Sequence, residues 1–303
     1  MPPSYPVLNA PLRELYICWR FIDNDIWDTI MPSLLIFFTA WAFDGRPVQD
    51  LPIAFLKSLA YAALYIYTFC LSNQVSSIPE DVLNKPYRPL PSGLVSVNET
   101  YGRIIVYNLI YLLVGYFLQI FWYSLAWVFV TCQLNFWGWS NHWASKNLLG
   151  MTLGTFLLFH VQWRIATLAP PANSTENYFF FMSAWAGVAL PIQDMRDQVG
   201  DKIQGRKTLP LSIGDSCARW ALCANFLTVC PALFLSALLT QVSLVQLVSH
   251  PVNVFIMAIS LLVHWCIAIR VLKYKTPVQD HRTYLLYVFL FCAGIPVINV
   301  VHT

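Results

Sequence analysis

The chain has 303 residues, of which 57% are hydrophobic and only 11% charged, and its formal net charge at pH 7 is +3. About a quarter of the residues in a soluble globular domain are charged, so this composition excludes an ordinary soluble protein. We expect an all-α integral membrane protein with membrane lipid, and no nucleic acid, among its partners.

The first 25 residues are polar and contain prolines, and they lack the apolar core of a cleavable signal peptide. We expect residues 1–25 to form a cytosolic N-terminal segment. Asp23, Asn24, Asp25 and Asp28 gather just before the first long apolar stretch. Polar residues at such a position usually cap a helix, and we interpret this cluster as a cap rather than as a metal site.

Nine apolar stretches follow, each about as long as the roughly 20 residues with which an α-helix crosses about 30 Å of hydrocarbon. They are residues 26–43, 52–72, 104–119, 121–138, 149–168, 177–193, 217–240, 252–272 and 283–301. Their continuous apolarity, without a strand-like alternation, predicts transmembrane helices rather than barrel strands. The third and fourth stretches are almost continuous, and only Gly115 and Gln119 indicate a turn between them.

Basic residues are distributed unevenly between the two faces that nine spans define. Fifteen of the 18 Lys and Arg residues fall on the face that holds the N-terminus, and only Arg46, Lys57 and Arg164 fall on the other. Cytosolic loops of membrane proteins carry such an excess. The sequence therefore predicts a multi-pass protein with a cytosolic N-terminus and, on the same face, two charged loops at residues 73–103 and 194–216.

The two charged loops have the same internal order. The first begins NQVSSIPEDVLNKPYRPLPSG and the second begins DMRDQVGDKIQGRKTLP, so that in each the acids precede the bases. A single loop of mixed charge is usually a solvated connector or a headgroup contact. Two such loops, one in each half of the chain, favour a shared site.

The second loop has a spacing that suits a metal site. Asp194, Asp197 and Asp201 are three and four residues apart, so on a helix continuing from the sixth span they would share one face. Like charges on one face repel one another unless a cation lies among them, and carboxylate oxygens suit Mg²⁺. Bases just beyond would meet phosphate oxygens, and these are Lys202, Arg206 and Lys207.

Both loops resemble the aspartate-rich motifs of the UbiA superfamily of intramembrane prenyltransferases. In that family a first motif N-[DQ]-x-x-D-x-x-x-D precedes P-L-x-S-G, and a second motif D-x-x-D-x-x-x-D precedes G-x-x-T. The second motif is complete here from Asp194 to Thr208, and Asn84 to Gly93 resembles the homogentisate-prenyltransferase branch. The resemblance covers residues 1–303 as a single domain. It implies nine transmembrane helices in a bundle around a central cavity, with both motifs on the cytosolic side of the endoplasmic reticulum membrane.

The first motif departs from the family pattern. Asn73, Gln74 and Asp81 match, but Ser77 replaces the middle acid and an additional acid, Glu80, precedes Asp81. Serine is a poorer Mg²⁺ ligand than a carboxylate, so one metal site is altered or is rebuilt around Glu80. A degenerate first motif in a short chain resembles the fungal membrane-bound terpene cyclase branch, of the fumagillin-pathway bergamotene synthase type.

The resemblance implies a site for an allylic isoprenoid diphosphate, farnesyl diphosphate in a sesquiterpene cyclase, with its head between the motifs. The catalytic, Mg²⁺-binding group would comprise Asn73, Asp81, Asp194, Asp197 and Asp201, with Glu80 as a further metal ligand. The bases that neutralise the leaving diphosphate would be Lys85, Arg88, Lys202, Arg206 and Lys207. Ionisation would leave an allylic cation inside the bundle, where water is scarce.

The fate of that cation distinguishes two activities. In a cyclase, a double bond of the same isoprenoid attacks the cation and a base then removes a proton. In a UbiA-type prenyltransferase, an aromatic or quinone-precursor acceptor attacks instead. Aromatic faces stabilise cations, and the candidates near the motifs are Tyr61, Tyr65, Tyr67, Phe69, Tyr107, Tyr111, Tyr116, Trp122, Trp127 and Trp185.

A membrane transporter or lipid-binding protein is an alternative of a different class. Transporters concentrate functional charge near the middle of the bilayer, often in broken helices. In this sequence the acids lie at predicted helix ends on one face, where a diphosphate head would arrive. We therefore expect an enzyme.

Overall fold

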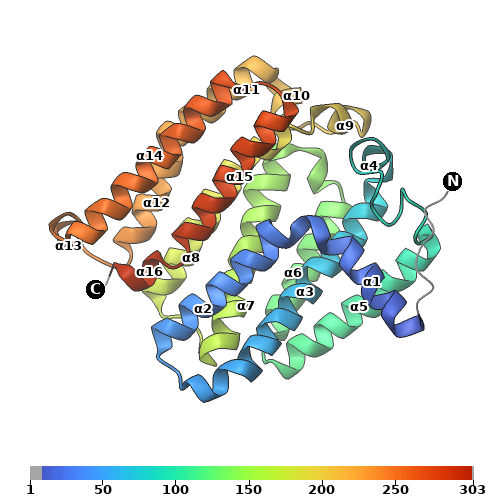
Figure 1. The fold of residues 1–303 in the computed structure, drawn as a ribbon, viewed down its shortest axis with the longest axis horizontal. Coiled ribbons are helices and arrows are strands. Elements are labelled where there is room, and N and C mark those ends of the chain that lie inside the picture. Colours follow the sequence, from blue (N-terminus) through green and yellow to red (C-terminus); the bar gives the residue numbers. More distant parts are fainter. Residues whose placement is uncertain (1–8, 302–303) are drawn as a thin grey trace.

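A computed structural model describes residues 9–301, and in this part of the chain the regular elements are helices, without a strand (Figure 1). The α-helices of the first half are α1 (Ala10–Ile22), α2 (Met31–Asp44), α3 (Leu51–Ser76), α4 (Ile78–Asn84), α5 (Val97–Phe117), α6 (Phe121–Asn135) and α7 (Thr152–Thr167). Those of the second half are α8 (Asn173–Ala189), α9 (Gln198–Ile203), α10 (Leu209–Ile213), α11 (Asp215–Leu227), α12 (Val229–Leu239), α13 (Leu244–Ser249), α14 (Pro251–Lys273), α15 (Pro277–Gly294) and α16 (Val297–Val300). Short 3-10 and π-helical segments are η1 (Asp23–Asp25), η2 (Ile26–Ile30), η3 (Val48–Asp50), η4 (Trp139–Asn141), η5 (Ala144–Met151) and η6 (Leu190–Met195).

Every predicted apolar stretch coincides with helix, but not every helix is long enough to cross a bilayer by itself. Within residues 9–301, five helical segments are long and apolar enough for a crossing, namely Ala10–Asp44, Val48–Ser76, Asp215–Leu239, Pro251–Lys273 and Pro277–Val300. Helices α6, α7 and α8 have 15, 16 and 17 residues, fewer than the roughly 20 that a crossing takes. The count of nine spans therefore stays a prediction.

The long helices form a closed ring. Helix α3 packs against α2 and α5, then α5 packs against α6, α6 against α7 and α7 against α8, while α2 and α7 also pack against each other across the ring. Helix α8 packs against α12, α12 against α14, and α14 against α15, which returns to α2 (Figure 1). A hydrogen bond from Asn299 Nδ2 to the Thr39 carbonyl (2.9 Å) joins the end of the chain to α2. The two halves of the sequence thus enclose a common interior.

The turn expected between the third and fourth stretches is confirmed. Helix α5 ends at Phe117 and α6 begins at Phe121. Gln119 adopts a left-handed backbone conformation (φ 60°). Gly115 lies so close to α6 that a β-carbon there would be 2.2 Å from Oγ of Ser124. A glycine at this position therefore allows the two helices to meet directly after the turn.

The expectation that one continuous helix carries Asp194, Asp197 and Asp201 is wrong. Pro191 has no N–H for the next helical hydrogen bond, and α8 ends at Ala189. Asp194 lies in the 3-10 segment η6, Asp197 lies in the break before α9, and Asp201 lies within α9. The three acids are therefore presented by three different local structures.

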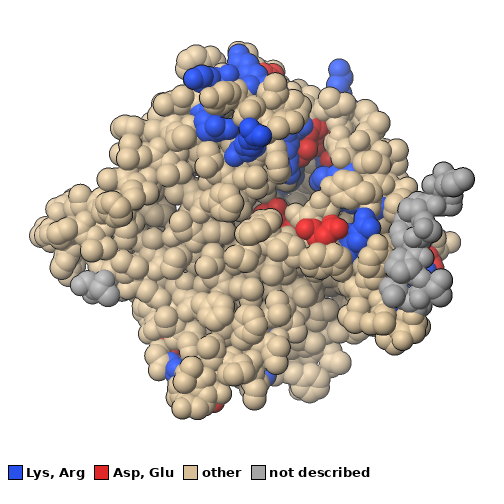
Figure 2. Space-filling model, viewed as in Figure 1, with Lys and Arg blue, Asp and Glu red and all other residues tan. Residues whose placement is uncertain are grey.

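Charged side chains are concentrated at one end of the bundle. Figure 2 shows Lys, Arg, Asp and Glu around a hollow at the end where α4 and α9 lie, while most of the remaining surface in this view is uncharged. An uncharged belt suits contact with hydrocarbon, where an unpaired charge is costly. The hollow is the entrance to the site described next.

Candidate active site

A cavity opens at the charged end and is lined by residues from both halves of the chain. Asn73, Phe69 and Tyr65 line it along α3, and because they are four residues apart they lie on successive turns of one helix face. The polar residue is nearest the charged end of the helix, and the aromatic residues lie further into the bundle. The cavity therefore changes from charged to aromatic along its length.

The two charged motifs pack directly against each other through α4 and α9. Gly200 on α9 faces Asn84 and Glu80 on α4, and Gln204 Nε2 donates a hydrogen bond to the Ser76 carbonyl (2.8 Å). This contact brings together parts of the sequence that are more than a hundred residues apart. The first and second motifs consequently form one side of the cavity entrance.

Each acid of the two motifs is paired with a base in this structure. The N···O distances are 2.8 Å for Arg88–Asp81, 2.8 Å for Lys146–Asp194, 3.3 Å for Arg196–Asp197, 2.5 Å for Arg206–Glu80 and 3.1 Å for Arg206–Asp201. Across residues 9–301, no three His, Cys, Asp or Glu side chains are grouped as the ligands of one metal ion would be. The acids are instead held apart by internal cations.

Only some of the site residues expected from the sequence reach the cavity. Those that line it are Asn73, Glu80, Lys85, Arg88, Asp197, Asp201 and Arg206. Asp81 and Asp194 are buried behind it and contact the lining bases Arg88 and Lys146. Lys202 and Lys207 are exposed and are not among the lining residues.

The lining acids offer oxygen donors that fit Mg²⁺. Oδ2 of Asp201 is buried and has no hydrogen-bond partner. Burial raises the pKa of Asp201 to about 6, although the charges of Lys146 and Arg206 oppose the rise. A carboxylate that is desolvated in this way is stabilised by a nearby cation, and carboxylate and amide oxygens are ligands of Mg²⁺. Among the motif residues that line the cavity, those with oxygens of this kind are Asp197, Asp201, Glu80 and Asn73.

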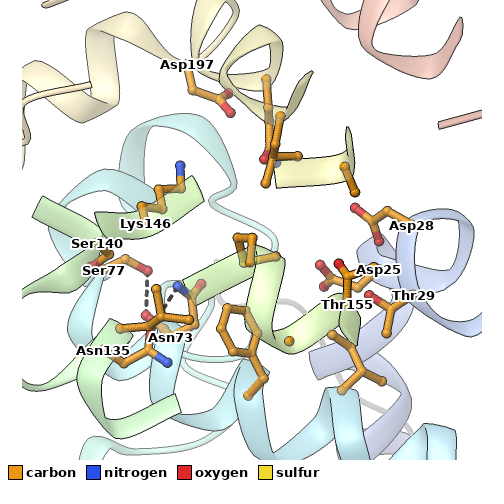
Figure 3. Close-up of a pocket in the computed structure, with 18 of the residues that line it drawn as sticks. Asp25, Asp28, Thr29, Asn73, Ser77, Asn135, Ser140, Lys146, Thr155 and Asp197 are labelled. Carbon is orange, nitrogen blue, oxygen red and sulfur yellow. Dashed lines mark hydrogen bonds between the residues drawn. The ribbon is translucent and has the colours of Figure 1, made fainter. Parts of the chain in front are cut away.

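Ser77, which replaces the middle acid of the first motif, is buried and bound to its neighbours. Its hydroxyl donates to the Asn73 carbonyl (2.7 Å) and lies 3.3 Å from Oδ2 of Asp81. Asn73 Nδ2 in turn donates to Oδ1 of Asn135 (3.2 Å), as the dashed lines of Figure 3 show. The serine thus organises the end of α3, while Glu80 is the acid of this motif that lines the cavity.

The interpretation of the acidic cluster before the first span as a helix cap is wrong. No side-chain capping hydrogen bond is formed at η1 or η2. Asp25 and Asp28 instead line the cavity, on the wall opposite Asn73 and Lys146 (Figure 3). The sequence contained one indication that these acids do more than cap a helix. Four of the six residues from 23 to 28 are polar, whereas a cap needs only one or two.

Two aromatic walls face the interior. On one side Trp127 stacks on Tyr65 (ring centroids 4.1 Å apart) and on Phe69 (5.7 Å). On the other, α15 contributes residues that the sequence analysis did not select, namely Tyr284, Tyr287 and Phe291. Of the aromatic candidates that were selected, Tyr116 and Trp122 are 66% and 76% exposed and cannot reach the interior.

A sequence profile of the UbiA prenyltransferase family matches residues 29–293. The chain belongs to the UbiA prenyltransferase family. It is therefore an enzyme of the UbiA superfamily and an integral, multi-pass membrane protein, as the sequence predicted.

Relatives of this UbiA-family chain include both cyclases and transferases. It is 34% identical to diterpene cyclase eriG of Hericium erinaceus, over 93% of this chain and 88% of that one. It is 31% identical to polyprenyl transferase eriF of the same organism, over 95% of each chain. Identity to fumagillin beta-trans-bergamotene synthase af520 of Aspergillus fumigatus is 26%, over 71% of this chain and 72% of that one. The resemblance to the terpene cyclase branch is thereby confirmed.

Solved structures of UbiA homologues share the fold. A UbiA homologue from Archaeoglobus fulgidus bound to DMAPP and Mg²⁺ superposes with a TM-score of 0.64, covering 93% of this chain and 98% of that one at 17% identity. At this level of identity the likeness concerns the fold alone. The all-helical UbiA fold expected from the sequence is confirmed.

Proposed function

We propose that this protein is a membrane-bound, Mg²⁺-dependent terpene cyclase that ionises an allylic isoprenoid diphosphate and cyclises the resulting cation. The observation that carries the proposal is the continuity of the cavity from the charged motifs to the two aromatic walls. One cavity of this kind offers partners both for a diphosphate head and for a carbocation. The identity to a diterpene cyclase supports the same activity.

The diphosphate would lie among the bases that line the entrance, which are Lys85, Arg88, Lys146 and Arg206. Charge-assisted hydrogen bonds from these groups favour the departing diphosphate as the carbon–oxygen bond breaks. Bound Mg²⁺ would add positive charge at the same oxygens. Exposed Lys202 and Lys207 can act on the diphosphate only from the rim.

The isoprenoid tail would extend past Asn73 toward Phe69, Tyr65 and Trp127. Ring faces there stabilise positive charge without reacting with it, and the apolar surroundings keep water from the cation. Farnesyl diphosphate is the substrate expected from the family resemblance. Geranylgeranyl diphosphate is the second substrate to test, because the relative that is 34% identical is named a diterpene cyclase.

The uneven distribution of basic residues supports a cytosolic position for the charged end of the bundle and for the N-terminus. We place the enzyme in the endoplasmic reticulum membrane on the family resemblance. Its single domain would then receive a water-soluble diphosphate head from the cytosol and a lipid-soluble tail from the bilayer. The product, an apolar hydrocarbon, can leave into lipid.

The test is to incubate microsomes containing the protein with each diphosphate and Mg²⁺, without an acceptor, and to analyse the extract by gas chromatography with mass spectrometry. A metal-dependent cyclic hydrocarbon that Asp197→Ala and Asp201→Ala each abolish would establish the cyclase. Asp44→Ala provides the matched control, since Asp44 is an exposed aspartate at the far end of α2. Hydrocarbon formation that persists in both motif variants would contradict the proposed site.

Acceptor prenylation is the second candidate, favoured by the 31% identity to a polyprenyl transferase over 95% of both chains. The same microsomes distinguish it. Activity that requires an added phenolic or quinone-precursor acceptor, with no hydrocarbon in its absence, would establish a prenyltransferase.

A further inference from the structure

The segment η2, which precedes α2, has an irregular backbone at the cavity wall. Its π-helical turn is closed by a hydrogen bond from the Met31 N–H to the Ile26 carbonyl, five residues back. Pro32 lacks an N–H, so the Asp28 carbonyl cannot receive the ordinary helical hydrogen bond from that position. Single π-helical turns often occur at functional sites. Here the turn directs the side chain of Asp28 toward the cavity (Figure 3).

The two carboxylate oxygens of Asp28 have different surroundings. Oδ2 accepts a hydrogen bond from the Tyr284 hydroxyl (2.9 Å), which comes from α15 and is 256 residues away in the sequence. Oδ1 is buried and has no hydrogen-bond partner. Leaving a buried acceptor unpaired costs stability, and a neutral side chain could tie η2 to α15 without that cost. The carboxylate is thus held at one oxygen, while the other oxygen has no donor and keeps its capacity to bind a proton.

Other acids that line the cavity are less suited to this task. Asp25 accepts a hydrogen bond from the Cys70 thiol (3.3 Å). Glu80 and Asp201 share Arg206, and Asp197 pairs with Arg196, all at the charged entrance where the diphosphate would lie. Asp28 is instead bound to a residue of the second aromatic wall.

That wall is a continuous set of rings. Tyr284 lies 5.8 Å from Tyr287, Tyr287 stacks on Trp185 at 5.3 Å, and Trp185 stacks on Phe291 at 5.9 Å, measured between ring centroids. Positive charge on a cyclising isoprenoid is favoured beside such rings. Asp28, which lines the same cavity and is bound to Tyr284, therefore lies beside the surface where the cation would be held.

We propose that Asp28 is the base that ends the cyclisation, and that Tyr284 is a positioning residue that holds it. The inference rests on the proposed cyclase function. In the final step a C–H bond next to the cationic carbon breaks, and its electron pair forms the new carbon–carbon double bond. The proton passes to the Asp28 carboxylate, while Tyr284 keeps its hydrogen bond to Oδ2. The hydrocarbon is then neutral, and no further reactant is needed.

The experiment compares Asp28→Asn, Asp28→Glu and Tyr284→Phe with wild type, and uses Asp44→Asn as the matched control on α2. Diphosphate release reports ionisation, and the product distribution reports how the cation is quenched. For Asp28→Asn we expect diphosphate release to stay within about threefold, while the share of the wild-type hydrocarbon falls by about 100-fold, the scale of general base catalysis. Other olefin isomers or alcohols from water capture should replace it.

Two further variants separate a chemical role from a structural one. Asp28→Glu should restore part of the wild-type product, because a carboxylate is present again. Tyr284→Phe should shift the distribution in the same direction as Asp28→Asn but less strongly. A purely structural role for Asp28 would lower diphosphate release and hydrocarbon in parallel and leave product proportions unchanged, and that result would overturn the proposal.

The failure of this inference is distinguishable from failure of the cyclase assignment. If the wild-type protein releases no hydrocarbon from either diphosphate, both are overturned together. If the wild type forms a hydrocarbon and Asp28→Asn forms it in the same proportion and at the same rate, only the role of Asp28 is overturned.

Discussion

Gly200 and Asn84 bring the backbone of the second charged motif into close contact with the first, since a β-carbon at Gly200 would lie 2.1 Å from Nδ2 of Asn84. The same β-carbon would lie 2.8 Å from Cγ of Glu80. Glu80 would therefore have to move, and it is one of the acids that hold Arg206. The spacing of the motifs depends on the absence of a side chain at this one position.

Replacing this glycine should damage the site without removing any polar group. We expect Gly200→Ala to lower turnover at least about tenfold, since overpacking costs about 1–3 kcal/mol and about 1.4 kcal/mol is a factor of ten. Gly102→Ala on α5 is the control, because nothing lies within 4 Å of a β-carbon there. Turnover is measured per amount of protein inserted in the membrane. Equal values for the two variants would show that the site still works when the two motifs are pushed apart.

Arg206 should contribute to binding of the diphosphate. It contacts both motifs, through Glu80 and Asp201, and lines the cavity. Because charge-assisted hydrogen bonds contribute about 1.5–3 kcal/mol, Arg206→Gln should lower kcat/KM by about 10- to 100-fold, through a lower kcat as well as a higher KM. The control is Arg282→Gln, an exposed arginine on α15. A kcat/KM equal to that of the wild type would remove Arg206 from the diphosphate site.

Glu80 should replace the carboxylate that Ser77 lacks. If it does, Glu80→Gln raises the Mg²⁺ concentration for half-maximal turnover by about tenfold, which corresponds to about 1.4 kcal/mol of lost binding. Adding Ser77→Asp to the same chain should bring this concentration back toward the wild-type value. A double variant that needs as much Mg²⁺ as Glu80→Gln alone would show that the two positions do not serve the same ion.

Trp127 should stabilise the cation. It is 3% exposed and lines the cavity, whereas Trp122 on the same helix is 76% exposed. We expect Trp127→Leu to slow diphosphate release about 30-fold and to change the product proportions, because a desolvated cation–π contact contributes about 2 kcal/mol. Trp122→Leu should behave as the wild type. Thermal midpoints of both variants would identify any loss that comes from packing alone.

The helices could be predicted from sequence because the hydrocarbon core of a membrane restricts which residues, and which backbone structure, each spanning segment can have. A segment in lipid must satisfy its backbone hydrogen bonds internally and be continuously apolar, so the apolar stretches mark helices wherever they occur. The turn between α5 and α6 could be predicted for the same reason, because the residues that form it, Gly115 and Gln119, are neighbours in the sequence. The interruption after α8 was missed, although Pro191 is a local feature with a known effect.

The acids of the cavity wall could not be predicted in the same way. Asp28 meets Tyr284 across 256 residues, and nothing near Asp28 in the sequence indicates that contact. Lys146 was counted only as a basic loop residue, yet it is the partner of Asp194. Burial is the largest single effect and disfavours its charged form, but Asp194 and Asp201 together outweigh it and raise the pKa of Lys146. Pairings of this kind depend on how the ring of helices closes.

The ion pairs at the cavity entrance have a consequence for how strongly Mg²⁺ and the isoprenoid diphosphate bind in each other's presence. Oδ2 of Asp201 is already free of a donor, but Arg206 has to leave Oε2 of Glu80 before that oxygen can accept an external cation, and the guanidinium of Arg206 is then available to a phosphate. Each ligand thus releases the group that the other needs. Thermodynamic linkage makes this help reciprocal, so Mg²⁺ and the isoprenoid diphosphate should bind with positive cooperativity, and each should bind weakly without the other.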